Sequence, residues 1–462
     1  MFCSVKLPAH FALAFIVLKR LGKFFDRSSS QTNDGQHLVL KAHEHSLNPK
    51  KICRHACEIV RVLQKNNFEA YVVGGCVRDL LLDLNPKDFD IATNATPQQI
   101  KNLFRRSRII GRRFQIVHVQ FGREPIEVTT FRSNNTEKNE KVQQSASGLL
   151  TRDNMFGSIH DDANRRDLTI NALYYDTEKN TLHDFCDGLE DLAKRKIRII
   201  GNPSTRYSED PVRLLRVARF AAKLGFTVEA KSLKPIEKMS TNLKHVSAPR
   251  MFDETLKLFM GGYGLAVFQL LFEYRLFAQL IPQLNRLIEQ GHPTAKNMVE
   301  QALTNTDLRI RSNKRVTPAF IYAALLWPSV QKVSSEYVKQ GHPPASALTK
   351  AANEVISNQI PITAIPRRFT IAMREIWSMQ LTLVKRGGNR AQRSMENPRF
   401  RAAYDFILLR EQTGESLNGL GDWWTKYQDA SEDERQNMVQ KLNSHRSRNR
   451  RPRKRTNEPN NA

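Results

Sequence analysis

Two carboxylates lie close together near the start of the chain, where they could bind a metal. Asp88 and Asp90 are separated by one residue, so on a β-strand their side chains would point to the same face. Two neighbouring carboxylates repel each other unless a cation lies between them, and hard oxygen ligands of this kind suit Mg²⁺. The pair therefore predicts a magnesium site on Asp88 and Asp90.

The residues that precede this pair could hold a phosphate. Gly74 and Gly75 allow the backbone to come close to a ligand, and the amides that open the next helix can bind an anion. Arg78 would add a charge-assisted hydrogen bond to that phosphate, whereas Asp79 would cap the helix or hold Arg78. A phosphate cradle beside a two-metal site is typical of nucleotidyl transfer.

The elements that must position these groups are a short apolar strand, a glycine turn, a helix start and a second strand. A helix is expected near residues 51–66, and strands are expected at 70–73, 88–92, 115–121, 125–131, 170–176 and 181–186. Beyond Tyr207 the apolar spacing becomes helical and stays so to about residue 440. The pattern predicts an α+β fold, in which a mixed sheet with helices precedes a mainly α-helical body.

The full string Gly-Gly-x-Val-Arg-Asp, with Asp-x-Asp ten to twelve residues after Arg78, is far more specific than either short motif. It resembles the signature of the class II nucleotidyltransferases, which are the bacterial poly(A) polymerases and CCA-adding enzymes. The resemblance extends from about Lys51 to Trp424. It implies that the N-terminal part is a palm like that of DNA polymerase β.

A second motif, Arg-Arg-Asp-x-Thr-x-Asn-Ala, begins at Arg165. In the resembling enzymes this segment faces the nucleotide across the palm. Arg165 and Arg166 are natural triphosphate ligands, because a guanidinium pairs bidentately with phosphate oxygens. The resemblance implies that Asp167 completes the acidic centre. Glu127 remains the alternative third carboxylate, since it also lies on a predicted strand of the same domain.

A third motif repeats charged residues at intervals of three, at Asp210, Arg213, Arg216 and Arg219. On a helix this spacing gives a slowly winding polar stripe, which could be only a solvated face. The resemblance implies that Asp210 and Arg213 read the base, while Arg216 and Arg219 organise their surroundings. An Asp can accept from an exocyclic amine and an Arg can donate to a ring nitrogen, which is the edge that adenine and cytosine share.

The composition favours a polyanionic partner. The 462 residues carry 72 Lys and Arg against 46 Asp and Glu, a formal charge of +26. The five cysteines are an odd, scattered set, which favours a reducing cytoplasm over a disulfide framework. The apolar run at residues 11–18 is too short to span a bilayer, so no integral membrane insertion is expected.

Changes in composition divide the chain into five expected parts. These are a variable, largely flexible extension at 1–50, the nucleotidyltransferase head at 51–200, a nucleotide-recognition neck at 201–265, an RNA-binding body at 266–440 and a disordered basic tail at 441–462. Within them, the polar segments 26–50 and 133–148 are expected to be a flexible lead-in and a mobile loop.

Residues 109–114, Ile-Ile-Gly-Arg-Arg-Phe, resemble the segment typical of the poly(A) polymerases within this family. The resemblance then implies a template-independent adenylyltransferase that adds AMP from ATP to RNA 3′-hydroxyl ends, uses Mg²⁺ and releases pyrophosphate. RNA 3′ ends are the implied partner, with the RNA-decay machinery a further candidate. Two alternatives remain, a CCA-adding enzyme and a non-catalytic RNA-binding protein.

Overall fold

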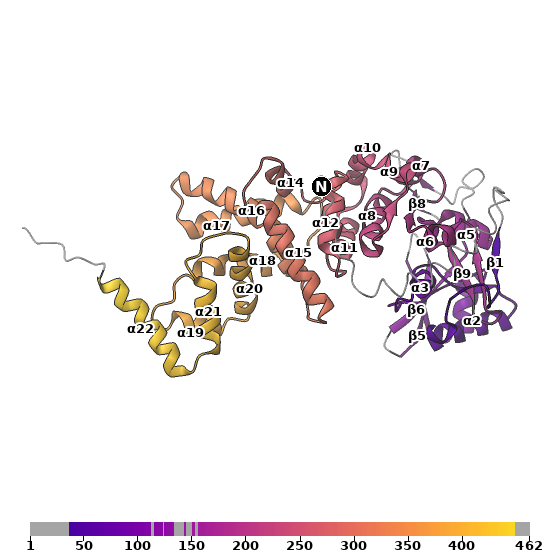
Figure 1. The fold of residues 1–462 in the computed structure, drawn as a ribbon, viewed down its shortest axis with the longest axis horizontal. Coiled ribbons are helices and arrows are strands. Elements are labelled where there is room, and N and C mark those ends of the chain that lie inside the picture. The colour runs from indigo at the N-terminus through magenta and orange to yellow at the C-terminus, as the bar shows by residue number, and fades with distance from the viewer. Residues whose placement is uncertain are drawn as a thin grey trace, which may run out of the picture. The chain divides into compact units, whose positions relative to one another are not determined.

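The computed structural model describes residues 37–111, 115–122, 124–133, 143–144, 150–152 and 156–448. It divides into two compact units (Figure 1). The first unit comprises Met1–Val246 with Glu273–Leu276, and the second comprises Ser247–Phe272 with Phe277–Ala462. The two units divide the chain differently from the five expected parts, which stay a prediction.

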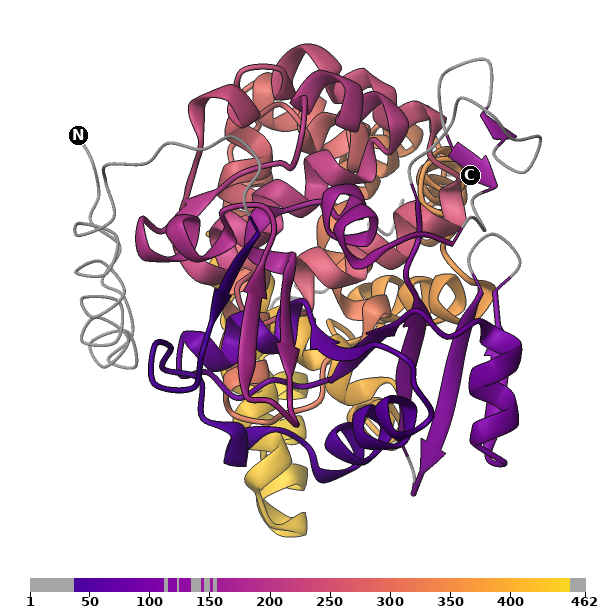
Figure 2. The same cartoon turned by 90° about the vertical axis from the view of Figure 1, so that its right-hand side faces the viewer.

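The first unit is built on a sheet of eight strands, in the order β1-β10-β9-β2-β3-β6-β5-β4. Figure 2 shows arrows of this sheet with helices beside them. The strands are β1 Leu38–Leu40, β2 Ala70–Val73, β3 Asp90–Thr93, β4 Ser107–Ile110, β5 Ile116–Phe121, β6 Glu124–Thr130, β9 Leu173–Asp176 and β10 Thr181–Asp184. Neighbouring strands of this sheet are antiparallel, except β3 and β6, which are parallel.

Apolar residues place β2 and β3 at the centre of this sheet. Val72 and Ile91 are fully buried, and they face each other in the β2–β3 register. Helix α2 (Arg54–Lys65) packs on these two strands through Ala56, Ile59 and other apolar side chains at helical spacing. Strand β2 and helix α2 therefore hold β3, the strand that begins with Asp90, in place.

Short helices and further strands complete the first unit. The helices are α3 Gly75–Leu81, α4 Pro97–Leu103, α5 Ile159–Arg165, α6 Gly188–Ala193, α7 Pro203–Glu209, α8 Val212–Leu224, α9 Ala230–Leu233 and α10 Ile236–Met239. Short 3-10 helices lie at η1 Pro49–Lys51, η2 Thr169–Asn171 and η3 Ser240–His245. Two small sheets pair β7 (Gln143–Gln144) with β8 (Leu150–Arg152), and β11 (Lys196–Ile197) with β12 (Thr227–Val228).

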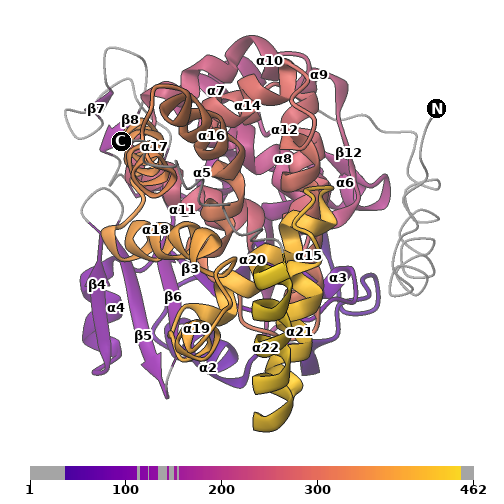
Figure 3. The ribbon, with the colours of Figure 1, turned by 90° about the vertical axis from the view of Figure 1, so that its left-hand side faces the viewer.

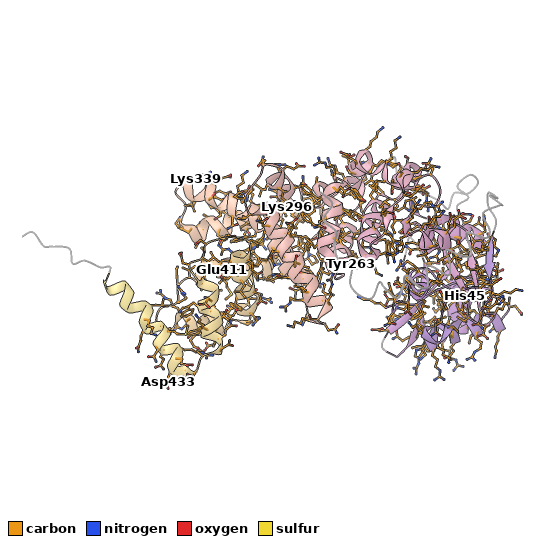
Figure 4. All side chains as sticks on the ribbon, viewed as in Figure 1. His45, Tyr263, Lys296, Lys339, Glu411 and Asp433 are labelled. Atoms are coloured by element: carbon orange, nitrogen blue, oxygen red, sulfur yellow. The ribbon has the colours of Figure 1, made fainter. Side chains whose placement is uncertain are left out.

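The second unit is helical throughout its described residues (Figure 3). Its helices are α11 Ala248–Phe259, α12 Gly264–Glu273, α13 Phe277–Leu280, α14 Pro282–Glu289, α15 Ala295–Arg311, α16 Pro318–Lys339, α17 Pro344–Gln359, α18 Arg367–Thr382, α19 Arg390–Met395, α20 Phe400–Gln412, α21 Leu420–Asp429 and α22 Glu432–Arg448. Trp377 and Trp424 are fully buried among them. Glu411 of α20, labelled in Figure 4, accepts a hydrogen bond of 3.0 Å from the Gly421 amide and so joins α20 to α21.

The prediction of a sheet with helices followed by a helical body is confirmed, but several boundaries differ. The lead-in expected to be flexible contains β1, which pairs with β10, and His45 (Figure 4) donates to the Asn180 carbonyl at 3.2 Å. The basic tail was expected to be disordered from Lys441, whereas α22 continues to Arg448. The rest of the tail, residues 1–36 and most of the loop predicted at 133–148 lie outside the described residues.

Among the described residues, no single helix is long and apolar enough to cross a membrane. Helices α11 and α12 reach the required length and composition only together, and the pair is bent by 119°.

Candidate functional site

Two carboxylates from neighbouring parallel strands face each other in the first unit. Asp90 is the first residue of β3, and Glu127 is its register partner on β6, so their side chains lie on the same face of the sheet. Both residues are exposed to solvent. Glu127 Oε1 is 3.3 Å from Nε2 of His118, which is the next residue in the same row on β5. Asp90, Glu127 and His118 therefore lie side by side in one row across β3, β6 and β5.

Asp88 reaches this site from outside the strand. The prediction that Asp88 and Asp90 share one strand is wrong, because β3 begins at Asp90 and Asp88 belongs to the exposed segment before it. Alternation along a strand therefore does not orient Asp88. Its charge nevertheless acts on Asp90, since it is one of the causes that raise the Asp90 pKa.

The electrostatics of Asp90 show an excess of negative charge. Desolvation and the charges of Glu127 and Asp88 raise the pKa of Asp90 to about 6, while Arg166 opposes the rise. Glu127 and Asp88 thus place two like charges beside Asp90. A hard divalent cation would relieve this repulsion, so the donor set fits such an ion. Within the described residues, no three His, Cys, Asp or Glu side chains are already grouped closely enough to hold a metal.

Asp167 has a different partner. Its Oδ2 pairs with Nε of Arg216 on α8, and its Oδ1 accepts a hydrogen bond of 2.9 Å from the Leu168 amide. Desolvation alone would raise the pKa of Asp167, but Arg216 and Arg213 outweigh it and hold the pKa well below the usual range. The aspartate is thus neutralised by the protein itself, unlike Glu127.

The glycine turn has the conformation that a close approach requires. Gly74 has φ of +84°, and its amide donates to the Leu173 carbonyl at 3.0 Å where α3 begins. A Cβ on Gly74 would lie 3.4 Å from Nη1 of Arg166, and a Cβ on Gly75 would lie 3.5 Å from Nη2 of Arg78. The turn therefore brings the start of α3 directly beside the Arg166 guanidinium.

Arg166 is held in place by two residues that the motif did not single out. Its Nη2 donates to Asp162 Oδ2 at 2.9 Å and its Nε donates to Tyr174 Oη, also at 2.9 Å. Tyr174 Oη in turn donates to Asp162 Oδ2 at 2.7 Å. Asp162 lies four residues before Arg166 on α5, a spacing that could have indicated the pair. The Arg166 side chain is 23 % exposed.

Arg78 was predicted to bind a phosphate, but its side chain is buried, since the residue is only 2 % exposed. Its Nη1 donates to Asn171 Oδ1 at 2.5 Å, and its Nε donates to Asp79 Oδ1 at 2.8 Å. Lys223 of α8 lies 3.3 Å from Asp79 Oδ2, and the Arg78 guanidinium lies 5.0 Å from the ring centre of Phe220. Arg78 therefore joins α3 to η2 and α8, with Asp79 as the partner that the sequence predicted.

The charged stripe predicted on one helix is interrupted. Asp210 lies between α7 and α8, where its Oδ1 accepts a hydrogen bond of 3.3 Å from the amide of Val212, the first residue of α8. Arg213 is on α8, and its Nη1 donates to Glu209 Oε2 at 3.0 Å and to the Arg206 carbonyl at 2.7 Å. Pro211 separates the two parts of the motif, because it lies between the end of α7 and the start of α8 at Val212.

The remaining arginines of α8 surround one aromatic ring. The guanidinium carbons of Arg216 and Arg219 lie 5.6 and 4.7 Å from the ring centre of Phe220. Arg206 of α7, which sequence reasoning missed, donates to the backbone carbonyls of Arg165 and Arg166 at 2.5 and 2.6 Å. It fixes the second motif onto α7, and nothing in its local spacing predicted that contact.

Three family models match the chain. They are the poly A polymerase head domain at residues 70–198, the "Probable RNA and SrmB- binding site of polymerase A" at 225–288 and the polymerase A arginine-rich C-terminus at 340–458. Nucleotidyltransferases of this superfamily generally use a divalent metal ion.

Similar proteins agree with these models. Poly(A) polymerase I of Haemophilus influenzae is 44% identical over 421 residues, which cover 90% of this chain and 93% of the relative. A CCA-adding enzyme of Oceanobacillus iheyensis is 36% identical over 225 residues, which cover 49% of this chain and 54% of the relative. A solved CCA-adding enzyme in an apo form has a TM-score of 0.55 at 18% identity, over 85% of this chain and 87% of that structure, which shows the shared fold.

Proposed function

The chain belongs to the poly(A) polymerase family and is an adenylate-adding nucleotidyltransferase, and we propose that Asp88, Asp90 and Glu127 form its metal-binding centre. The observation that carries this assignment is the register of β3 and β6, which sets Asp90 opposite Glu127. The raised pKa of Asp90 supports it, because a like charge from Glu127 contributes to the rise. Asp167, which the family motif suggested, already has Arg216 as its counterion.

The metal is proposed to be Mg²⁺, because carboxylate oxygens are the only ligand type in this set. When bound there, Mg²⁺ would lower the pKa of the attacking hydroxyl and offset the charge of the leaving pyrophosphate. Asp90 and Glu127 would hold the ion in a fixed place, because the strands that carry them also contain the buried residues Ile91 and Val128.

The triphosphate is proposed to lie against the start of α3. Gly74 would let the backbone come close to the phosphates, and the Gly75 amide at the start of α3 would donate to a phosphate oxygen, because the Gly74 amide already donates to Leu173. Arg166 would hold the phosphates with its exposed surface, kept in one orientation by Asp162 and Tyr174. Arg78 would act as a positioning residue that keeps α3 in place, rather than as a ligand.

Base selection is proposed for Asp210 and Arg213, as in the resembling enzymes. Both lie where α7 meets α8, close to Arg206, which contacts the backbone of the Arg165–Arg166 motif. Arg216 and Arg219 would fix the surroundings through Asp167 and Phe220. In this arrangement one recognition element reads the adenine edge while the neighbouring motif holds the phosphates.

The proposed reaction joins these parts. The RNA 3′-hydroxyl attacks the α-phosphorus of ATP and loses its proton, the bond from that phosphorus to the bridging oxygen of the β-phosphate breaks, and pyrophosphate leaves. The net charge of +26 supports RNA binding mainly through the backbone, with salt-sensitive and weakly sequence-specific affinity. RNA 3′ ends are the proposed substrate, in the cytoplasm, with the RNA-decay machinery as a further partner.

Product analysis with catalytic variants tests this proposal. We expect the purified chain, Mg²⁺, ATP and a 3′-hydroxyl RNA to give a ladder and one pyrophosphate for each AMP added. Asp90→Asn and Glu127→Gln should abolish or strongly reduce both products, whereas a matched change at exposed Glu124 on the same strand should not. Near-normal activity in Asp90→Asn would reject the metal centre, and near-normal activity in Glu127→Gln would reject the third carboxylate.

A further inference from the structure

The second unit contains a basic pocket inside the expected RNA-binding body at 266–440, and none of its residues has a role in the site described above. A cavity of about 680 Å³ lies where α18 ends and α19 begins, and its lining includes Ser378, Thr382, Lys385, Arg390, Arg393 and Asn397. We propose that this pocket binds phosphodiester groups of the RNA strand upstream of the 3′ end. The inference rests on the proposed function for the choice of RNA as the ligand.

The cations of this pocket lack acidic partners. Lys385, Arg390 and Arg393 are exposed, and among the described residues their side chains have no ion pair or hydrogen bond. The lining contains no Asp or Glu. The nearest acids along the chain are Glu375, which pairs with Arg399, and Glu396, which accepts a hydrogen bond from Gln392 and does not line the pocket. Three cations without counterions around one hollow favour a bound anion.

Neutral donors supplement these charges. Asn397 uses its Oδ1 to accept from the Arg399 amide at 2.8 Å, which leaves its Nδ2 hydrogens for a ligand oxygen. The Ser394 hydroxyl also lines the pocket and has no protein partner among the described residues. Hydroxyl and amide donors beside Arg and Lys are the groups that contact phosphate oxygens in protein–nucleic acid interfaces.

The segment that forms the rim is continuous in sequence. Residues 383–393 contain four cations and no acid, and Gly388 turns the chain with φ of +58°. Arg386 is the exception, because its guanidinium lies 4.8 Å from the ring centre of Trp423 and burial lowers its pKa. Arg386 therefore anchors the loop, while the other three cations remain available to a ligand.

The volume of the pocket favours an RNA strand over a free anion as its ligand. The same cations could attract inorganic pyrophosphate, which is a product of the proposed reaction. A cavity of about 680 Å³ is much larger than pyrophosphate, and its three cations lie on both a loop and a helix. Successive phosphodiesters of an extended RNA strand would fill more of this volume than one compact anion and could contact the cations of both the loop and the helix.

A salt titration of RNA binding tests the pocket in the full chain. The variant carries Lys385→Gln, Arg390→Gln and Arg393→Gln. The matched control carries Lys257→Gln, Arg401→Gln and Lys426→Gln, three cations of the same unit that pair with Glu254, Asp405 and Asp422. Affinity for a single-stranded 3′-hydroxyl RNA is measured between 50 and 200 mM salt, without ATP, and thermal unfolding checks the fold.

Each lost phosphate contact should flatten the plot of log affinity against log salt by about 0.7. Three contacts give a change of about 2, so the unaltered chain should lose about 20-fold more affinity than the pocket variant over that salt range. The control should keep most of the original slope. If the pocket variant does not fold, Arg393→Gln alone should still flatten the slope by about 0.7.

Equal slopes for the pocket variant and the unaltered chain would overturn the inference. The inference would also be overturned if the pocket variant kept the original salt slope with RNA but lost binding of inorganic pyrophosphate. The pocket would then be a site for a free polyphosphate. Because no ATP is present, these outcomes do not depend on catalysis. Failure of the proposed function would instead appear as an absent ladder with the salt slopes as expected.

Discussion

Amide substitutions at Glu127 and Asp167 should change the stability of the metal-free protein in opposite directions. Glu127 repels Asp90 across the β3–β6 register, so Glu127→Gln should be stabilising. Asp167 is the counterion of Arg216, so Asp167→Asn should leave a partly buried guanidinium without its charge partner. The two changes remove the same formal charge and differ only in surroundings.

The size of the Glu127 effect follows from the pKa of Asp90. A rise from 3.8 to about 6 corresponds to roughly 3 kcal/mol at full weight. A raised carboxyl pKa is destabilising above the pKa of the unfolded state, and the penalty is complete above pH 6. Solvent at the exposed side chains screens the repulsion between Glu127 and Asp90. This repulsion therefore lowers the free energy of unfolding by about 0.5–1 kcal/mol. We expect a rise in Tm of about 2 °C.

The Asp167 effect should be larger and of the opposite sign. The side chain is 12 % exposed, and removing one partner of a buried ion pair costs about 3 kcal/mol. Thermal unfolding at pH 8 with a chelator measures both changes, and a Mg²⁺ titration follows. Mg²⁺ should raise the Tm of the unaltered chain and of Asp167→Asn, and should raise that of Glu127→Gln much less.

The reverse pattern would refute this reasoning. If Asp167→Asn stabilised the metal-free protein and removed the Mg²⁺ effect, Asp167 would be the third carboxylate. A Glu127→Gln variant with a lower Tm and an unchanged response to Mg²⁺ would then show that Glu127 is structural.

Three further predictions concern the neighbouring residues and the end of the chain. Arg78→Met should lower the free energy of unfolding by about 3 kcal/mol, because it leaves Asp79 and Asn171 without their buried partner; an unchanged Tm with a raised KM for ATP would instead restore a phosphate-binding role. The stability of the fold, measured against pH, should include a contribution from the Asp167–Arg216 pair above about pH 4. This contribution should be lost as pH falls, since the pKa of Asp167 is lowered in the folded state. The same loss of stability at acid pH in Asp167→Asn would contradict the pairing. Removing residues 449–462, which leaves α22 intact, should weaken RNA affinity and flatten its salt dependence, and identical slopes would exclude a contribution from the tail.

Local patterns predicted the parts of the site that depend on nearby residues. The apolar β2 strand, the Gly74 turn and the start of α3 follow from sequence alone, because each is set by propensities within a few residues. Asp79 was also predicted as the partner of Arg78, to which it is adjacent.

Tertiary pairing determined what the sequence left open. Asp90 and Glu127 are 37 residues apart, and only the parallel register of β3 and β6 sets them opposite each other. The burial of Arg78 depends on η2 and α8, which lie far along the chain. Asp210 lies outside the expected helical stripe because α8 begins only after Pro211, at Val212. Each difference arises where a distant element decides the environment of a charged side chain.

Nucleotide selectivity during RNA extension tests the central claim most directly. The purified chain is incubated with a generic 3′-hydroxyl RNA and Mg²⁺, with each nucleoside triphosphate separately, and with a tRNA that lacks its 3′ end. The account predicts a long ladder with ATP alone, and an Asp210→Ala variant should extend with the other nucleotides more readily. A short extension of the truncated tRNA that requires both CTP and ATP, with no ladder on generic RNA, would contradict it.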